Sequence, residues 1–186
     1  GVKVDVFRLR SQGPISYHEF HNVDVITGSA EALHTLLSNG RYRSVLVHFL
    51  DEAMWSVLQH HIEHTKVVVW VHGAEIHPWY RRTFNLVSEQ EREVAKAQSD
   101  VRMAFWRDLL RTMPPNLRLV FVSNSFAEEV MEDLGFRLPD DAYSIIHNPI
   151  DTYRFSYQPK PEAQRRKILS IRPYASRQYA NDLSVA

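Results

Sequence analysis

The stretch "VVVWVHGAEIHPWYRR", residues 67–82, decides how the chain is interpreted. Its unbroken hydrophobic run predicts a strand covered on both faces, because such strands lack polar alternation. The run ends in His72 and Gly73, and Glu75, Arg81 and Arg82 follow within ten residues. A buried strand needs only to end, whereas these polar groups are able to bind an anion or a sugar.

Similar apolar runs recur between helical stretches. Expected strands cover residues 2–7, 23–27, 44–49, 67–71, 117–122 and 143–146, and expected helices cover residues 30–38, 52–64, 89–112 and 126–134. This alternation implies right-handed crossovers and a parallel sheet. The fold class predicted is therefore α/β, a Rossmann-like parallel sheet with helices on both faces.

Local signals mark the ends and faces of the expected helices. Ser88 with Glu91, and Ser125 with Glu128, have the spacing of a capping box, and Gly135 stands where a helix C-cap is expected. One apolar stripe is expected along the helix at 89–112, formed by Val94, Ala97, Val101, Phe105 and Leu109.

Composition excludes several classes of protein. Lys plus Arg and Asp plus Glu both total 22, and this zero net charge argues against a nucleic-acid partner. No cysteine is present, which excludes disulfides and thiolate metal sites and fits a cytoplasmic location. No apolar run approaches the roughly 20 residues that span a bilayer, although a peripheral membrane contact stays open.

Ligands of an open parallel sheet bind beyond the carboxyl ends of its strands. His48, His72 with Gly73, and Asn148 each follow an expected strand directly. His48 is equally compatible with a core histidine and a ligand contact. Gly73 permits a positive φ or a close approach of the backbone to a ligand. Ser125 is interpreted as a plain N-cap.

One metal motif competes with this interpretation. The segment "HHIEH", residues 60–64, contains H-x-x-E-H, which would place His60 and His64 on one helix face with Glu63 as a base. Surface histidines near a helix C-terminus are the alternative, because no third ligand is evident. Neither a P-loop, nor G-x-G, nor a G-x-S-x-G elbow occurs.

The chain changes texture after Phe155. "SYQPKPEAQRRK", residues 156–167, is typical of a linker, and "ILSI" then predicts a new strand. Arg172 and Arg177 flank the loop that follows. Two guanidiniums at this place are able to clamp a diphosphate, since Arg binds phosphate oxygens in a bidentate way. Two solvated arginines in a basic tail are the alternative.

Three segments follow one another in a familiar order: "VFVSNSFAEEVMEDLGF" (120–136), "IIHNPIDTYRF" (145–155) and "ILSIRPYASRQYANDL" (168–183). Together with "VHGAEI" (71–76), they resemble the central stretch of GT-B glycosyltransferases of the family 4 type. The chain departs from the family pattern at Pro149, Ser170, Ile171 and Gln178.

The resemblance implies a domain layout and a set of site residues. Residues 1–155 would be the Rossmann-like acceptor-side domain lacking its first βα unit, 156–167 the linker, and 168–186 the beginning of the donor-binding domain. Arg172 and Arg177 would hold the donor diphosphate, and His72 would be the catalytic residue near the transferred sugar. The residues lining the acceptor side of the cleft would be Gly73, Glu75, Arg81, Arg82, His48 and Asn148.

The function implied is metal-independent, retaining transfer of a sugar from a nucleotide-sugar donor to a sugar, lipid or other acceptor. No cofactor is expected, because the nucleotide-sugar is a substrate. We expect the chain alone to be inactive, since half of the cleft is missing. Two alternatives stay open: a non-catalytic Rossmann-like binding module and, less favoured, a zinc hydrolase using His60, Glu63 and His64.

Overall fold

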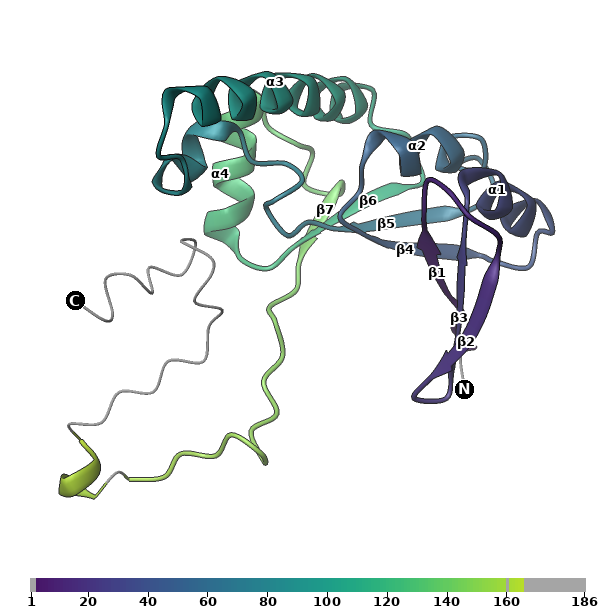
Figure 1. The fold of residues 1–186 in the computed structure, drawn as a ribbon. Coiled ribbons are helices and arrows are strands. Elements are labelled where there is room, and N and C mark those ends of the chain that lie inside the picture. The colour runs from purple at the N-terminus through teal and green to yellow at the C-terminus, as the bar shows by residue number, and fades with distance from the viewer. Residues whose placement is uncertain (1–2, 160, 166–186) are drawn as a thin grey trace.

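The computed structural model describes residues 3–159 and 161–165 and contains two sheets (Figure 1). The larger is parallel throughout and has the order β4 (Ser44–His48), β5 (Lys66–Trp70), β6 (Leu117–Phe121) and β7 (Tyr143–Ile145). The smaller has the order β1 (Val6–Leu9), β3 (Val23–Gly28) and β2 (Ser16–Phe20). The predicted α/β class with a parallel sheet is confirmed.

Four helices accompany the sheets: α1 (Ala30–Ser38), α2 (Glu52–Leu58), α3 (Glu89–Thr112) and α4 (Asn124–Leu134). Strands β4 to β7 are added in one direction, so right-handed crossovers place α2, α3 and α4 on the same face. On that face Val69 and Leu119 are paired in register, fully buried, and belong to one core with Trp106 of α3. Helices on both faces of this sheet were expected. The opposite face is left open at β4, because Leu46, which lies on that face, is 61% exposed.

Strand β2 was not predicted, because its five residues are all exposed and carry no apolar pattern. It pairs antiparallel with β3 through a two-residue turn at His21 and Asn22, whose φ values are 50° and 62°. Positive φ at both central residues matches the right-handed twist of a hairpin. Strand β1 begins at Val6, later than expected.

Two predicted helices differ at their ends. Helix α2 ends at Leu58, its last buried residue, and residues 59–64 form turns instead of continuing the helix. Helix α4 begins at Asn124, because the Ser123 hydroxyl accepts the backbone N–H of Phe126 at 3.1 Å. Ser123 is therefore the N-cap, and the prediction of Ser125 was wrong. The C-cap at Gly135 (φ 82°) is confirmed.

Helix α3 has the predicted bounds, and its capping box at Ser88 and Glu91 is formed. The predicted apolar stripe is confirmed at its C-terminal end, where Leu109 is buried and Phe105 packs against the core, but it is wrong at Val94 and Val101, which are 51% and 66% exposed. Ser99 is fully buried instead and accepts the backbone N–H of Trp79 at 2.9 Å. Trp79 begins the 3-10 segment η1 (Trp79–Asn85), so this contact fixes η1 on α3.

After β7 the chain leaves the sheet and runs without a helix or strand through the described part of 146–159 (Figure 1). A 3-10 turn, η2 (Glu162–Gln164), follows. The expected donor-domain segment 168–186 lies outside the described residues. Within the residues that are described, no helix combines the length and the apolar character needed to cross a bilayer.

Candidate functional site

Two histidines meet at the carboxyl ends of neighbouring parallel strands. His48 is the last residue of β4, and His72 follows β5 by two residues. His48 Nδ1 lies 2.8 Å from His72 Nε2, so the N–H of one imidazole donates a hydrogen bond to the ring nitrogen of the other. Burial, and then the neighbouring His72, lower the pKa of His48 below its ordinary value. Both side chains are exposed, so the pair offers polar groups to a ligand.

Aromatic rings extend this pair into a row. The Phe49 ring stacks on His72 with 4.5 Å between ring centroids, and His48 stacks on His72 at 5.1 Å and on Trp70 at 6.0 Å. Phe49 was not predicted as a site residue. It adopts a φ of 56°, a left-handed conformation that costs a bulky residue about 1–3 kcal/mol. The sequence contains one signal for this strain. The connection between β4 and Asp51, the N-cap of α2, has neither Gly nor Asn, so a positive φ there falls on a residue that adopts it at a cost.

A tight turn after β5 holds His72 in place. Gly73 has a φ of 100°, and a Cβ there would lie 3.1 Å from the His77 ring. Glu75 is only 8% exposed, and its Oε1 accepts the backbone N–H of His72 at 2.6 Å. Its carbonyl accepts the indole N–H of Trp106 at 2.7 Å. Glu75 therefore positions the His72 backbone and is buried, although it was expected to line the acceptor side of a cleft.

Arg102 of α3 contacts this turn and was not predicted as a site residue. Its guanidinium donates to the His77 carbonyl at 2.7 Å. Arg102 Nε and Glu75 Oε2 are both buried without a hydrogen-bond partner within the described residues. Burial, and then repulsion from Arg82, lower the pKa of Arg102. Arg82, a predicted cleft residue, is half-buried at a kink in η1 and adds positive charge to this region.

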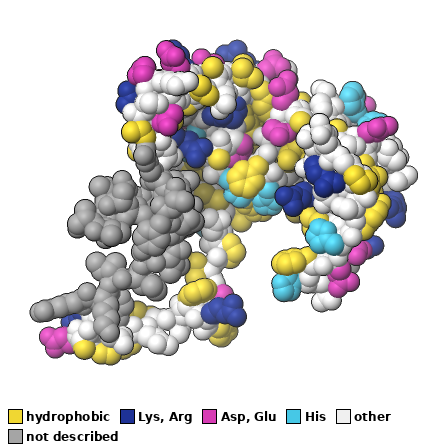
Figure 2. All heavy atoms as spheres, in the orientation of Figure 1, with side chains coloured by type: hydrophobic (Ala, Val, Ile, Leu, Met, Phe, Trp, Pro, Cys, Tyr) yellow, Lys and Arg dark blue, Asp and Glu magenta, His cyan; other side chains and the backbone are white. Residues whose placement is uncertain are grey.

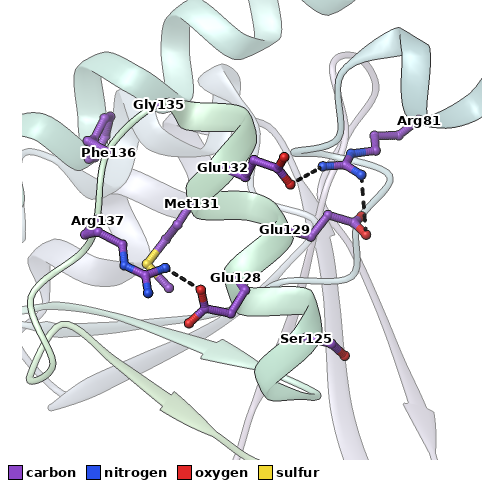
Figure 3. Close-up of a pocket in the computed structure, with 9 residues that line it drawn as sticks. All are labelled: Arg81, Ser125, Glu128, Glu129, Met131, Glu132, Gly135, Phe136 and Arg137. Atoms are coloured by element: carbon purple, nitrogen blue, oxygen red, sulfur yellow. Dashed lines mark hydrogen bonds and ion pairs between the residues drawn. The ribbon is translucent and has the colours of Figure 1, made fainter.

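The guanidinium of Arg81 points toward α4 (Figure 3). Its guanidinium donates to the Asp133 carboxylate at 2.9–3.1 Å and to Glu132 at 3.0 Å. The Tyr80 hydroxyl also donates to Asp133, at 2.8 Å. The hydrogen bond to Asp133 is the main cause that raises the pKa of Arg81. Arg81 is therefore occupied by α4 carboxylates.

A surface hollow of about 730 Å³ lies beside α4. Figure 3 shows the residues that line it, among which Arg81 and Arg137 both contact glutamates. Because its two arginines are already paired, this hollow offers little positive charge to an anion. His77 lies beside the hollow, with its Nε2 3.0 Å from a carboxylate oxygen of Glu129, which lines it. The two atoms lack hydrogen-bond alignment, and because burial lowers the pKa of His77, the contact is an ion pair only when the imidazole is protonated.

The remaining predicted site residues lie apart from the histidine pair or outside the described chain. Asn148 is exposed after β7, and β7 is separated from β5 by β6. Its neighbour His147 contacts the Val122 carbonyl through Nδ1 at 2.9 Å. Arg172 and Arg177 are outside the described residues.

The helical geometry needed for the zinc motif is not formed. His60, Glu63 and His64 lie in the turns after α2, so the two histidines do not share a helix face. The nearby His61 pairs with His34 of α1 at 3.1 Å. Among the residues described, no group of three His, Cys, Asp or Glu side chains is arranged to hold a metal ion.

Similarity to known proteins adds no assignment to this geometry. Comparison of the chain with family models, with curated proteins and with solved structures finds no match.

Proposed function

We propose that the chain is part of a glycosyltransferase of the GT-B type, acting in the cytoplasm on a nucleotide-sugar. The observation that carries this proposal is the exposed pair of His48 and His72 at the carboxyl ends of β4 and β5. This is the edge where parallel α/β sheets bind ligands. The order of the motifs along the sequence supports the same conclusion.

In the proposed reaction, the bond between the donor's anomeric carbon and its phosphate oxygen breaks. The acceptor hydroxyl oxygen forms the new bond on the same face of the sugar, and its proton passes to the departing diphosphate. Arg172 and Arg177 neutralise the charge that develops on this leaving group. His72 hydrogen-bonds the transferred sugar, and Glu75 and Gly73 fix the backbone that carries it.

Binding of the diphosphate is tested on the full-length protein by thermal unfolding with and without uridine, guanosine and adenosine diphosphates. We expect one of them to stabilise the fold, by about 2.7 kcal/mol at a concentration 100 times its Kd. Arg172→Ala should abolish this stabilisation, while His72→Ala should keep it. Arg118→Ala, in β6, is the matched control. The absence of stabilisation by all three nucleotides contradicts the proposal.

Turnover separates this proposal from a non-catalytic binding module. Release of nucleoside diphosphate from a nucleotide-sugar should require both Arg172 and His72. A module that only binds nucleotides would show the thermal stabilisation without release. We expect His72→Ala to lower release about 100-fold, the effect of one misplaced hydrogen-bonding group at a reacting centre.

A further inference from the structure

Helix α3 has two different faces, and the described part of the chain covers only one of them. The inner face lies in the core, where its buried residues include Ser99, Met103, Trp106 and Leu110. The outer face carries an exposed apolar row, called here the outer stripe, which consists of Val94, Ala97, Val101 and Ala104. Helix α3 lies along the outer edge of the molecule (Figure 1), and Figure 2 shows hydrophobic side chains among acidic and basic ones on the surface there.

The outer stripe has the spacing of a coiled-coil seam. Its four residues follow one another at intervals of three, four and three positions, so they lie in one line along about three turns of the helix. A narrow seam of this kind is typical of a helix that packs against one other helix, whereas a helix that packs against a globular core has a wider apolar face. Val94 and Val101 are 51% and 66% exposed. Within the described residues, the outer stripe therefore has no partner helix.

Charge narrows the class of partner. Glu93 and Asp100 lie beside the outer stripe and are exposed, which disfavours a membrane surface because membrane lipids carry negative charge. The chain as a whole has a formal net charge of zero, so two copies approach each other without net repulsion. A second copy of the chain meets both conditions.

The order of residues in the outer stripe is complementary to itself when two helices run in opposite directions. Centred near residue 99, this pairing places Val94 against Ala104 of the second copy and Ala97 against Val101 of the second copy, and the two-fold axis repeats both contacts. Each layer then contains one large and one small side chain. A parallel pair would instead place Ala against Ala, which leaves voids in two layers. Opposed helix dipoles also favour the antiparallel pair.

A second surface feature matches this arrangement. A hollow of about 500 Å³ lies beside the N-terminal end of the outer stripe, and its lining residues include Leu86, Gln90, Val94, Ala95 and Gln98. Phe105 is half-buried on the same side of α3, six positions after the centre of the pairing. In the antiparallel pair, Phe105 of the second copy therefore lies level with the middle of this hollow.

We propose that α3 pairs antiparallel with α3 of a second copy through the outer stripe and forms a symmetric dimer. The inference does not depend on the proposed function, because the outer stripe lies on α3 and the histidine pair lies at the ends of β4 and β5. The seam is only about 15 Å long, so the interface is small and the dimer dissociates with a Kd on the order of 10 µM.

Sedimentation equilibrium of the full-length protein from about 1 to about 200 µM tests the dimer. We expect a reversible change from monomer to dimer, and Val101→Glu should weaken it at least about 100-fold, because two unpaired carboxylates enter the seam. Leu46→Glu is the matched control, since Leu46 is 61% exposed on β4, and it should dimerise normally. Urea unfolding of Val101→Glu at low protein concentration should match the parent, which shows that the variant is folded.

Disulfide formation tests the direction of the helices. The printed sequence contains no cysteine, so a disulfide within it joins only introduced residues. An equal mixture of Ala97→Cys and Val101→Cys should form a disulfide between the two different variants, which mass spectrometry of the linked peptides identifies. Each variant alone should form little, because its own two cysteines are offset by about 6 Å along the antiparallel axis.

A monomer at every concentration overturns the inference, and so does a dimer that Val101→Glu leaves intact. Disulfides that form within each single variant in preference to the mixture overturn the antiparallel pairing. Nucleoside diphosphate stabilisation is measured in the same samples. If it is absent while the dimer forms as described, the proposed transferase fails and the dimer does not.

Discussion

Two clusters of charged and aromatic side chains, one on each side of the turn after β5, differ in how well their groups are satisfied. Around Arg81, every partner is supplied by the protein: Asp133 accepts from Arg81 and from Tyr80, and Glu132 accepts from Arg81. Around His72, imidazole nitrogens face solvent and Phe49 is strained and exposed. A saturated network stabilises a fold, whereas strained residues with open hydrogen-bonding groups are typical of ligand sites.

The largest effect is expected at Asp133, which is 7% exposed and holds Tyr80 and Arg81 together. Asp133→Ala should lower the free energy of unfolding by about 3 kcal/mol, because it leaves a partly buried guanidinium without its main partner. Urea unfolding measures this. Glu132→Ala is the control, since Glu132 is 77% exposed and should cost under about 0.5 kcal/mol. Equal losses in both variants would break the comparison.

His77 links the two clusters and should make stability depend on pH. Burial is the main cause that lowers its pKa in the folded state, against attraction from Glu129 and Asp133, while Arg81 reinforces the lowering and Glu75 opposes it. Unfolded His77 titrates near 6.5, so the unfolded chain binds this proton first. The stabilising contribution is therefore complete above pH 6.5 and is lost as pH falls toward the folded-state pKa.

The expected loss is at most about 1.4 kcal/mol per pH unit below pH 6.5. Urea unfolding between pH 7.5 and 5.5 measures it, and His77→Gln should give a shallower slope than the wild type. His48 and His61 also have lowered pKa values, so they add to the slope of the wild type. The His61→Gln variant is measured in parallel, so that the change caused by His77→Gln is compared with the change caused by removing another histidine of this kind. An identical slope in His77→Gln shows that His77 does not titrate as described.

The smallest effect has the opposite sign. Phe49→Asn should raise the free energy of unfolding by about 0.5 kcal/mol, because Asn tolerates the left-handed conformation that costs Phe about 1–3 kcal/mol. Lost stacking on His72 offsets part of the gain. Phe84→Asn, at a similarly exposed residue with helical φ, should give no gain. A clear loss at Phe49 would mean that the ring stack stabilises the fold.

Much of the fold followed from local pattern. Continuous apolar runs predicted β4 to β7 within one or two residues, and α1 and α3 have the predicted bounds. Strand β2 was missed because pairing with β3, and not an apolar face, holds it in place. The N-terminal part of the α3 stripe failed because Ser99 is turned inward against η1, a tertiary contact that hydrophobic periodicity does not contain.

Candidate site residues were predictable only by type and position along the strands. The sequence indicated that His48 and His72 lie at strand ends. The structure places His48 Nδ1 2.8 Å from His72 Nε2. It did not indicate that Glu75 turns inward to hold His72, or that Arg81 turns to α4. These directions depend on partners 31 to 52 residues away along the chain or on a three-residue turn, which spacing alone does not specify.

The sequence by itself determined the parallel α/β sheet and the edge at which its polar residues gather, because strand runs and crossover handedness are local properties. Tertiary structure alone decided which of those residues are free. Asp133 neutralises Arg81, while the positive φ of Phe49 leaves an aromatic face exposed beside His72. Whether a charged or aromatic group is occupied or open is a property of three-dimensional neighbours, and residue identity does not encode it.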